Sequence, residues 1–170
     1  MSNKVVKYNN QMNEVNLNGY TEKELNMFFT IIFIAREKHT NLLEISFSNL
    51  KELSNGDTHS QRFINTLENV NRKLIRMAHE IQIGNDKHIF SLFNVFTTNT
   101  QTQILTVRIN EIFAYMLNDL IGNFTKFDLL EFVSLKSSYS KNMFKLLKQW
   151  ESKKKKNLRL RNLGKYFQFL

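Results

Sequence analysis

A run of amide and basic side chains between residues 59 and 77 has the composition that the reading of DNA bases requires. Arginine can donate two hydrogen bonds to O6 and N7 of guanine, and asparagine can pair with N6 and N7 of adenine. Each such bidentate pair contributes about 1–3 kcal/mol of discrimination between bases. The candidate side chains are Arg62, Asn65, Thr66, Asn69, Arg72, Lys73 and Arg76. We therefore interpret this segment as a candidate DNA-reading helix.

The same segment carries an apolar stripe that predicts how the helix is held. The stripe follows a 4-3-4-3 spacing through Phe63, Leu67, Val70, Leu74 and Met77. This spacing places the five side chains on one buried helix face. Upstream, Thr58 and Gln61 have the spacing of a capping box, which predicts a helix from there to about Ala78.

Position along the helix divides the candidates into two groups. Recognition helices usually enter the major groove by their N-terminal end. We therefore expect base contacts from the first group, which is Arg62, Asn65, Thr66 and Asn69. Lys73 and Arg76, further along, are expected to hold phosphates and so to set the register on the duplex. A solvated face of an amphipathic helix explains the same residues without any DNA, and this alternative stays open.

The elements around this helix predict the fold that positions it. Thr21 and Glu24 form a capping box that opens a helix to about Lys38, followed by a strand over residues 43–47 and a short helix over 48–53. After the long helix, residues 81–83 and 89–96 flank a Gly-Asn-Asp turn and predict a hairpin. This order is that of a winged helix, an α+β fold that is here mostly helical. Lys87, beside the hairpin turn, is a candidate for one phosphate contact, and a solvated turn explains it equally well.

The remaining segments complete the prediction as a single domain with appendages. We expect a polar loop over residues 97–102 and a strand over 104–109. C-terminal helices are expected over residues 111–120, 127–135 and 139 to about 154. The predicted organisation is a polar N-terminal arm over 1–19, with a short edge strand around Val5–Tyr8, a winged-helix domain over 20–150 and a basic tail over 151–170.

The net charge of +9 is concentrated at the C-terminal end. Residues 141–170 hold ten basic residues and one acidic residue, whereas residues 1–140 hold fourteen of each. An inference of polyanion binding from charge therefore concerns the last thirty residues, where a solvated helix end is the alternative. For the rest of the chain, DNA binding depends on the placement of individual side chains.

Other chemistry finds little support in the sequence. The chain has no cysteine, and its four histidines lack the i, i+4 pairing of ligands on one helix face, so we expect no metal site. No Gly-rich phosphate loop, carboxylate pair or Ser-His-Asp arrangement is present, so we expect neither a catalytic residue nor a cofactor. No apolar run reaches the length of a membrane span, and the expected compartment is the cytoplasm.

One stretch is similar to a known family. The sequence FVSLKSSYSKNMFKLLK, from Phe132 to Lys148, resembles the initiator Rep proteins of iteron-type plasmids, the Rep_3 family. The segments over residues 113–120 and 124–127 are similar to the part that precedes this signature. The chain departs from the family pattern at Asn142, where an arginine is common, and after Trp150, where a second winged helix is expected and does not follow.

The resemblance implies a function and partners. It implies that full-length members have two winged-helix domains, bind repeated origin sequences, recruit host replication proteins and form dimers. By this resemblance the chain is the N-terminal winged helix, which is associated in the family with dimerisation and auxiliary DNA contacts. Our hypothesis is a non-enzymatic initiator of plasmid replication that binds double-stranded origin DNA. Two alternatives are a winged-helix transcriptional repressor and a dimerisation module without base-specific binding.

Overall fold

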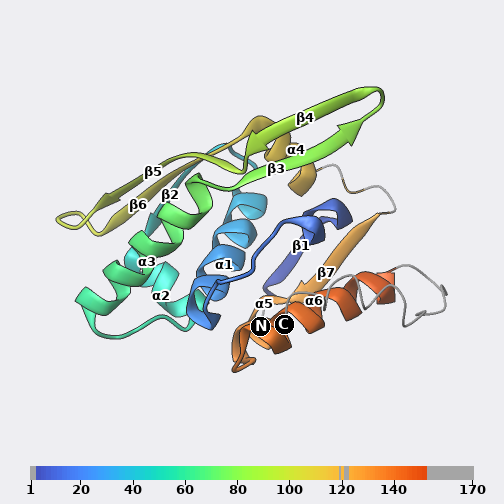
Figure 1. Cartoon of the computed structure of the whole chain (residues 1–170). Coiled ribbons are helices and arrows are strands. Elements are labelled where there is room, and N and C mark those ends of the chain that lie inside the picture. The colour runs from blue at the N-terminus through green and yellow to red at the C-terminus, as the bar shows by residue number, and fades with distance from the viewer. Residues whose placement is uncertain (1–2, 119, 121–122, 153–170) are drawn as a thin grey trace.

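The computed structural model describes residues 3–118, 120 and 123–152 (Figure 1). The helices of this part are a 3-10 turn η1 (Asn10–Glu14) and α1 (Glu22–Lys38), α2 (Phe47–Ser54), α3 (Ser60–Ile75), α4 (Glu111–Asn118), α5 (Leu129–Ser134) and α6 (Ser138–Ser152). The strands are β1 (Val5–Asn9), β2 (Leu42–Ser46), β3 (Ala78–Ile83), β4 (Asp86–Ser91), β5 (Phe93–Asn99), β6 (Ile104–Ile109) and β7 (Phe124–Asp128). The mixture of helices and antiparallel sheets confirms the predicted α+β class.

Helix α1 lies at the centre of the molecule, between α2 and α3 on one side and β1 and β7 on the other (Figure 1). Its capping box is present as predicted: the Glu24 amide donates to Thr21 Oγ1 at 3.3 Å, and the Thr21 amide donates to Glu24 Oε2 at 2.8 Å. Phe28, Phe29 and Ile32 are buried, because their three- and four-residue spacing places them together on the inner side of the helix. The helix ends at Lys38, with His39 in the left-handed conformation at φ 49°.

A three-stranded antiparallel sheet, in the order β2-β6-β5, supports the helix-turn-helix pair α2 and α3. Inward-facing residues such as Leu43, Ile45, Leu105 and Val107 are fully or almost fully buried, and they alternate with more exposed, outward-facing residues. The predicted strand over 104–109 is confirmed. The expected short helix begins at Phe47, and Ser46 caps it by accepting from the Asn49 amide. The order α1, β2, α2, α3, β5, β6 is that of a winged helix.

The predicted hairpin around the Gly-Asn-Asp turn is confirmed, but its second strand ends at Ser91 instead of Phe96, because the rest of the segment belongs to another sheet. Strands β3 and β4 form a separate hairpin, from the pair Ala78↔Ser91 to the pair Ile83↔Asp86. Leu92 and Phe93 are adjacent and both fully buried, so the inward–outward alternation changes phase between β4 and β5. Strand β5 then pairs with β6 in the other sheet and extends to Asn99, through the first half of what was expected to be a polar loop.

The N-terminal segment is part of the core and does not form the predicted polar arm. The expected edge strand near Val5–Tyr8 is present as β1, which pairs antiparallel with β7. Val6 and Tyr8 are fully buried, and Met12 and Leu17 nearly so, because β1 and η1 pack on the same core as α1. The expected helix start at Phe127 is also wrong: β7 continues to Asp128, whose carboxylate caps α5 by accepting from the Glu131 amide. The predicted tail lies almost entirely outside the described residues.

Candidate nucleic-acid interface

Helix α3 is held by its apolar stripe, as the spacing predicted. Phe63, Leu67, Val70 and Leu74 are each 0% exposed. Met77 lies beyond the helix end at Ile75 and is only partly buried against the core. The expected capping box is wrong, since His59 is the N-cap residue and its side chain makes no capping hydrogen bond. The four buried side chains therefore determine which face of the helix is turned outward.

On the outward face of α3, some candidate side chains bond to neighbours on the same helix and others do not. Asn65 accepts from Gln61 at 3.0 Å, and the Thr66 hydroxyl donates to the carbonyl oxygen of its own helix at Arg62. Arg72 is paired with Glu68 at 2.9 Å, and its second amino group lies 3.4 Å from the Asn69 side-chain oxygen. Exposed pairs of this kind contribute little stability and open readily. Arg62 and Arg76 are exposed, and no side-chain hydrogen bond or ion pair joins either guanidinium to another described residue.

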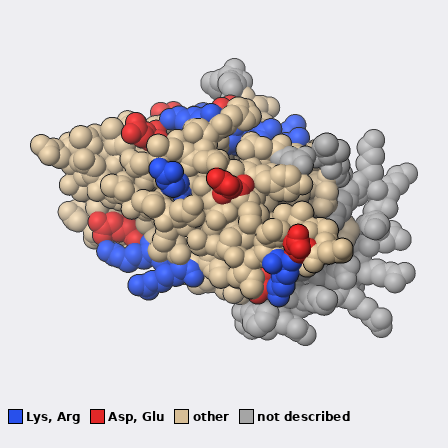
Figure 2. Space-filling view, turned by 90° about the horizontal axis from the view of Figure 1, so that it is seen from above, with Lys and Arg blue, Asp and Glu red and all other residues tan. Residues whose placement is uncertain are grey.

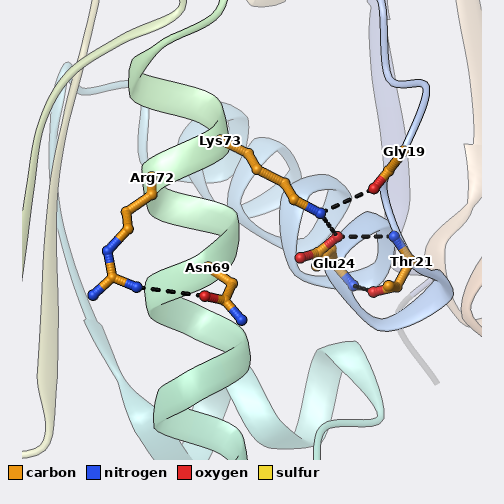
Figure 3. A network of polar contacts seen from close by, with 6 residues as sticks. All are labelled: Gly19, Thr21, Glu24, Asn69, Arg72 and Lys73. Atoms are coloured by element: carbon orange, nitrogen blue, oxygen red, sulfur yellow. Dashed lines mark hydrogen bonds and ion pairs between the residues drawn. The ribbon is translucent and has the colours of Figure 1, made fainter.

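Lys73 was predicted to hold a phosphate, and in the structure its partly exposed ammonium is bound by other residues of the protein (Figure 3). It lies 2.6 Å from Glu24 Oε2 and 2.9 Å from the carbonyl oxygen of Gly19, and it also stands over the Tyr20 ring. Glu24 is the same residue that completes the capping box of α1. Lys73 therefore joins α3 to the beginning of α1 and fixes the angle at which α3 is presented.

An open groove of about 540 Å³ runs between the first turn of α1 and the front half of α3. Its α3 side presents Arg62, Asn65, Thr66 and Asn69, so the four residues predicted to contact bases do lie together. Its other side holds the acids Glu22, Glu24 and Asp57. These carboxylates make the α1 side of the groove unfavourable for phosphates, although Glu24 and Asp57 are each paired with a lysine.

Asp57, on the acidic side of the groove, forms an ion pair with a lysine of α1. Its carboxylate lies 2.6 Å from Lys23 Nζ, and this hydrogen bond lowers the pKa of Asp57, with a smaller contribution from the charge of Arg62. Arg62 is thus near a carboxylate without being tied to it. Its guanidinium keeps all its donors for an external acceptor.

Lys87 lies on β4, which is not part of the three-stranded sheet. Its ammonium pairs with Glu80 across the β3–β4 hairpin at 2.5 Å. In topology, the hairpin that corresponds to the wing of a winged helix is β5–β6, because its strands join β2 in one sheet. Lys87 therefore lies on an additional hairpin, β3–β4, which follows α3 in the sequence and precedes the wing. This hairpin forms its own sheet and contributes no residue to the groove.

Charge on the surface is mixed. On the face shown in Figure 2, the described basic and acidic side chains lie close to one another and form no broad basic field. Lys141 and Lys145 belong to the basic C-terminal thirty residues, yet they are buried, with 0% and 5% of their surface exposed. These two charges are therefore not available to a polyanion. In the described part, no cluster of three potential metal ligands occurs, and no helix is long and apolar enough to cross a membrane.

Comparison with known proteins points to one family. The sequence pattern of the family described as "Initiator Replication protein, WH1" matches residues 5–148. The chain is 34% identical over 154 residues to "Probable replication protein rep" of Bifidobacterium longum (strain NCC 2705), a match that covers 89% of this chain and 52% of the relative. The chain thus spans about half the length of this curated relative.

A solved structure has a similar fold. It is described as "Crystal structure of Pi initiator protein in complex with iteron DNA" and superposes with a TM-score of 0.63 at 14% identity. The similarity covers 88% of this chain and 65% of that one. At this identity the comparison supports the winged-helix fold and does not transfer individual residues.

Proposed function

The chain belongs to the initiator replication protein family, in the part described as WH1, and on this premise we propose that it takes part in plasmid replication initiation by binding double-stranded origin DNA. The observation that carries the proposal is the outward face of α3. Four amide, hydroxyl and guanidinium side chains line one groove there, and Arg62 has no side-chain partner among the described residues. These are the donors that base edges in the major groove accept.

The comparisons support duplex DNA as the partner. The similar solved structure is, by its description, an initiator bound to iteron DNA, which makes repeated origin sequences the ligand we propose here. In this proposal α3 reads bases with Arg62 and Asn65, Arg76 contacts phosphate, and Lys73 positions the helix. The proposed mechanism is non-enzymatic, without cofactor, and operates in the cytoplasm, with host replication proteins as further partners.

The test is a comparison of affinity for origin repeats and for scrambled duplex. Replacing both Arg62 and Asn65 with alanine should abolish the preference for the repeats, because two bidentate contacts of about 1–3 kcal/mol each are lost. A fluorescence-anisotropy titration at fixed salt measures both affinities. Salt must be held constant, since the phosphate contribution varies steeply with it.

The matched control is the double variant Lys136→Ala with Asn118→Ala. It removes one basic and one amide side chain from exposed positions, one between α5 and α6 and the other on α4, outside α3 and the β5–β6 hairpin. The control should keep the preference. A wild-type chain that binds both duplexes equally, or an α3 variant that keeps its preference, would contradict the proposal.

A homodimer is the second part of the proposal. Apolar side chains are exposed on the hairpin and on the outer face of the three-stranded sheet, namely Ile83, Ile89, Val95 and Leu42 at 40%, 63%, 45% and 46%. Val95 and Leu42 flank Arg108 in register, so they share one sheet face. Burial of such a face against a second copy would remove it from water. Sedimentation equilibrium should show a dimer that Ile89→Lys dissociates, whereas a wild-type monomer would contradict it.

Two alternatives give different outcomes in these experiments. A transcriptional repressor with this fold would prefer a promoter sequence over the origin repeats. A dimerisation module without its own reading of bases would form the dimer and show no sequence preference. Arg72 and Lys73 are engaged in ion pairs with Glu68 and Glu24, which by itself would suggest a helix that does not read DNA. Arg62 and Asn65 remain exposed, however, so these ion pairs do not favour either alternative.

A further inference from the structure

The β1–β7 ribbon carries a second group of cations, on the face turned away from the core. Val6 and Tyr8 on β1, and Thr125 and Phe127 on β7, are buried, so the residues between them face outward. Two of these, Lys7 and Lys126, are direct partners in the strand register.

A third cation, Arg36, comes from the last turn of α1. Its charge and that of Lys126 both act on Lys7: burial is the largest cause that lowers the pKa of Lys7, and these two charges lower it further. We call Lys7, Arg36 and Lys126 the ribbon cluster.

This arrangement has a cost that the fold does not explain. Like charges directly opposite on antiparallel strands are destabilising. Among the described residues, no ion pair involves any member of the ribbon cluster, whereas nearby Lys4 pairs with Glu52. The next acid on the outward face of β7 is Asp128, and its carboxylate is used to cap α5. Arg36 has a structural reason for its position, since a cation at a helix C-terminus is favourable, but the two lysines have none.

The Lys7 ammonium is also held in place. It lies 4.0 Å from the centre of the Phe124 ring, on the same outward face of the ribbon. A cation–π contact of this kind limits the freedom of a long lysine side chain. The charge therefore stays over the ribbon instead of extending into solvent.

We propose that the ribbon cluster is a second DNA contact, which binds phosphates of the duplex backbone without regard to sequence. This inference rests on the proposed function for the identity of the polyanion. Helix α3 is flanked by Glu22, Glu24 and Asp57, so it gains little from phosphates on that side. A separate site on β1, β7 and α1 supplies the attraction that the groove of α3 lacks, and it positions the domain rather than selecting bases.

The experiment measures how affinity for a scrambled duplex depends on salt, using the full chain. Each phosphate contact contributes about 0.9 to the slope of log Kobs against log salt concentration on B-form DNA. The double variant Lys7→Gln with Lys126→Gln should therefore flatten the slope by about 1.8. The control, Lys38→Gln with Lys136→Gln, removes the same charge from two exposed positions outside the ribbon: Lys38 ends α1 and donates to the Glu44 carbonyl of β2, and Lys136 lies between α5 and α6. The control should leave the slope unchanged.

Thermal melting checks the fold of each variant. Loss of the opposed charges should not lower the melting temperature of the double variant. If it does fall, the single variant Lys126→Gln, which leaves Lys7 on its ring, should still flatten the slope by about 0.9. A slope equal to that of the wild type, or an equal change in the control, would overturn the inference.

Failure of this inference is distinguishable from failure of the proposed function. Suppose that the wild type prefers origin repeats but the Lys7→Gln, Lys126→Gln variant has an unaltered salt slope. The ribbon cluster would then not be a DNA contact, and α3 would remain the proposed reading element. If the variant has a flattened slope but the wild type shows no preference for origin repeats, the ribbon cluster would be a DNA contact and α3 would not read bases.

Discussion

Replacement of Phe29 with alanine should lower the free energy of unfolding by about 3–5 kcal/mol, the usual cost of removing a buried phenyl ring and leaving a cavity. The side chain is 0% exposed. Its ring centre lies 4.7 Å from that of Phe132, 5.7 Å from Phe127 and 5.9 Å from Tyr8. Phe29 is thus where β1, β7 and α5 meet the central helix. Urea denaturation measures the loss.

The control is Phe33→Ala, one turn further along the same helix. Phe33 is only partly buried against the core, so the same substitution should cost about 1 kcal/mol. Hydrogen exchange adds a local test: in the Phe29 variant, amides of β1 and β7 should lose more protection than those of β5 and β6. Equal losses of stability for the two variants would mean that the aromatic cluster is not a principal part of the core.

The parts of the fold that were predicted correctly are those with local signals. The capping box at Thr21 and Glu24 and the stripe from Phe63 to Leu74 are encoded within one helix each, so spacing alone reveals them. The same reasoning found the groove residues of α3, because they are the complement of that stripe. Thr58 and Gln61 show the limit: the pattern is that of a capping box, yet the chain enters α3 at His59 without one.

The parts that were missed depend on contacts distant in sequence. Val5 pairs with Asp128, and nothing near either residue indicates the other. The pairing makes a core strand of an Asn-rich N-terminus that looked like an arm. The change of sheet at Leu92 is another example, since β5 is defined by its partner β6 and not by its own composition.

The role of Lys73 has the same origin. Its sequence position on the polar side of α3 is consistent with a phosphate contact, and only the approach of α1 brings Glu24 and the Gly19 carbonyl to it. The charge of residues 141–170 misled for a related reason. A lysine in an amphipathic helix is expected to extend into solvent, but Lys141 and Lys145 lie on the inner side of α6.

The second large effect concerns Lys145, whose ammonium is buried without a hydrogen bond to any described residue and stands 5.4 Å from the centre of the Phe29 ring. Burial lowers its pKa from 10.5 to about 8. In the unfolded chain the group keeps its ordinary pKa, so between pH 8 and 10.5 the unfolded state binds more protons. Stability therefore rises with pH across this window and is reduced by the buried charge below pH 8.

Lys145→Met should stabilise the protein by up to about 3 kcal/mol at pH 7, since each pKa unit corresponds to about 1.36 kcal/mol. Methionine has similar length and good helix propensity, so it fills the same space without a charge. The advantage over the wild type should shrink as the pH rises from 8 to 10.5, where both chains carry a neutral side chain. Chemical denaturation of both proteins at several pH values measures the difference.

Lys141, one turn earlier on α6, separates the two causes that act on a buried lysine. Burial also lowers its pKa to about 8, but its ammonium donates to the carbonyl oxygen of Phe132 at 2.6 Å and approaches that of Val133 at 3.4 Å. Lys141→Met would remove both contacts; the Phe132 carbonyl would keep only the Leu135 amide at 3.3 Å, and a buried carbonyl left unsatisfied costs about 1–3 kcal/mol. We therefore expect Lys141→Met to be neutral or destabilising at pH 7. If both variants stabilise the protein equally, loss of hydration alone determines the cost of a buried lysine here, and the bonds to α5 contribute nothing.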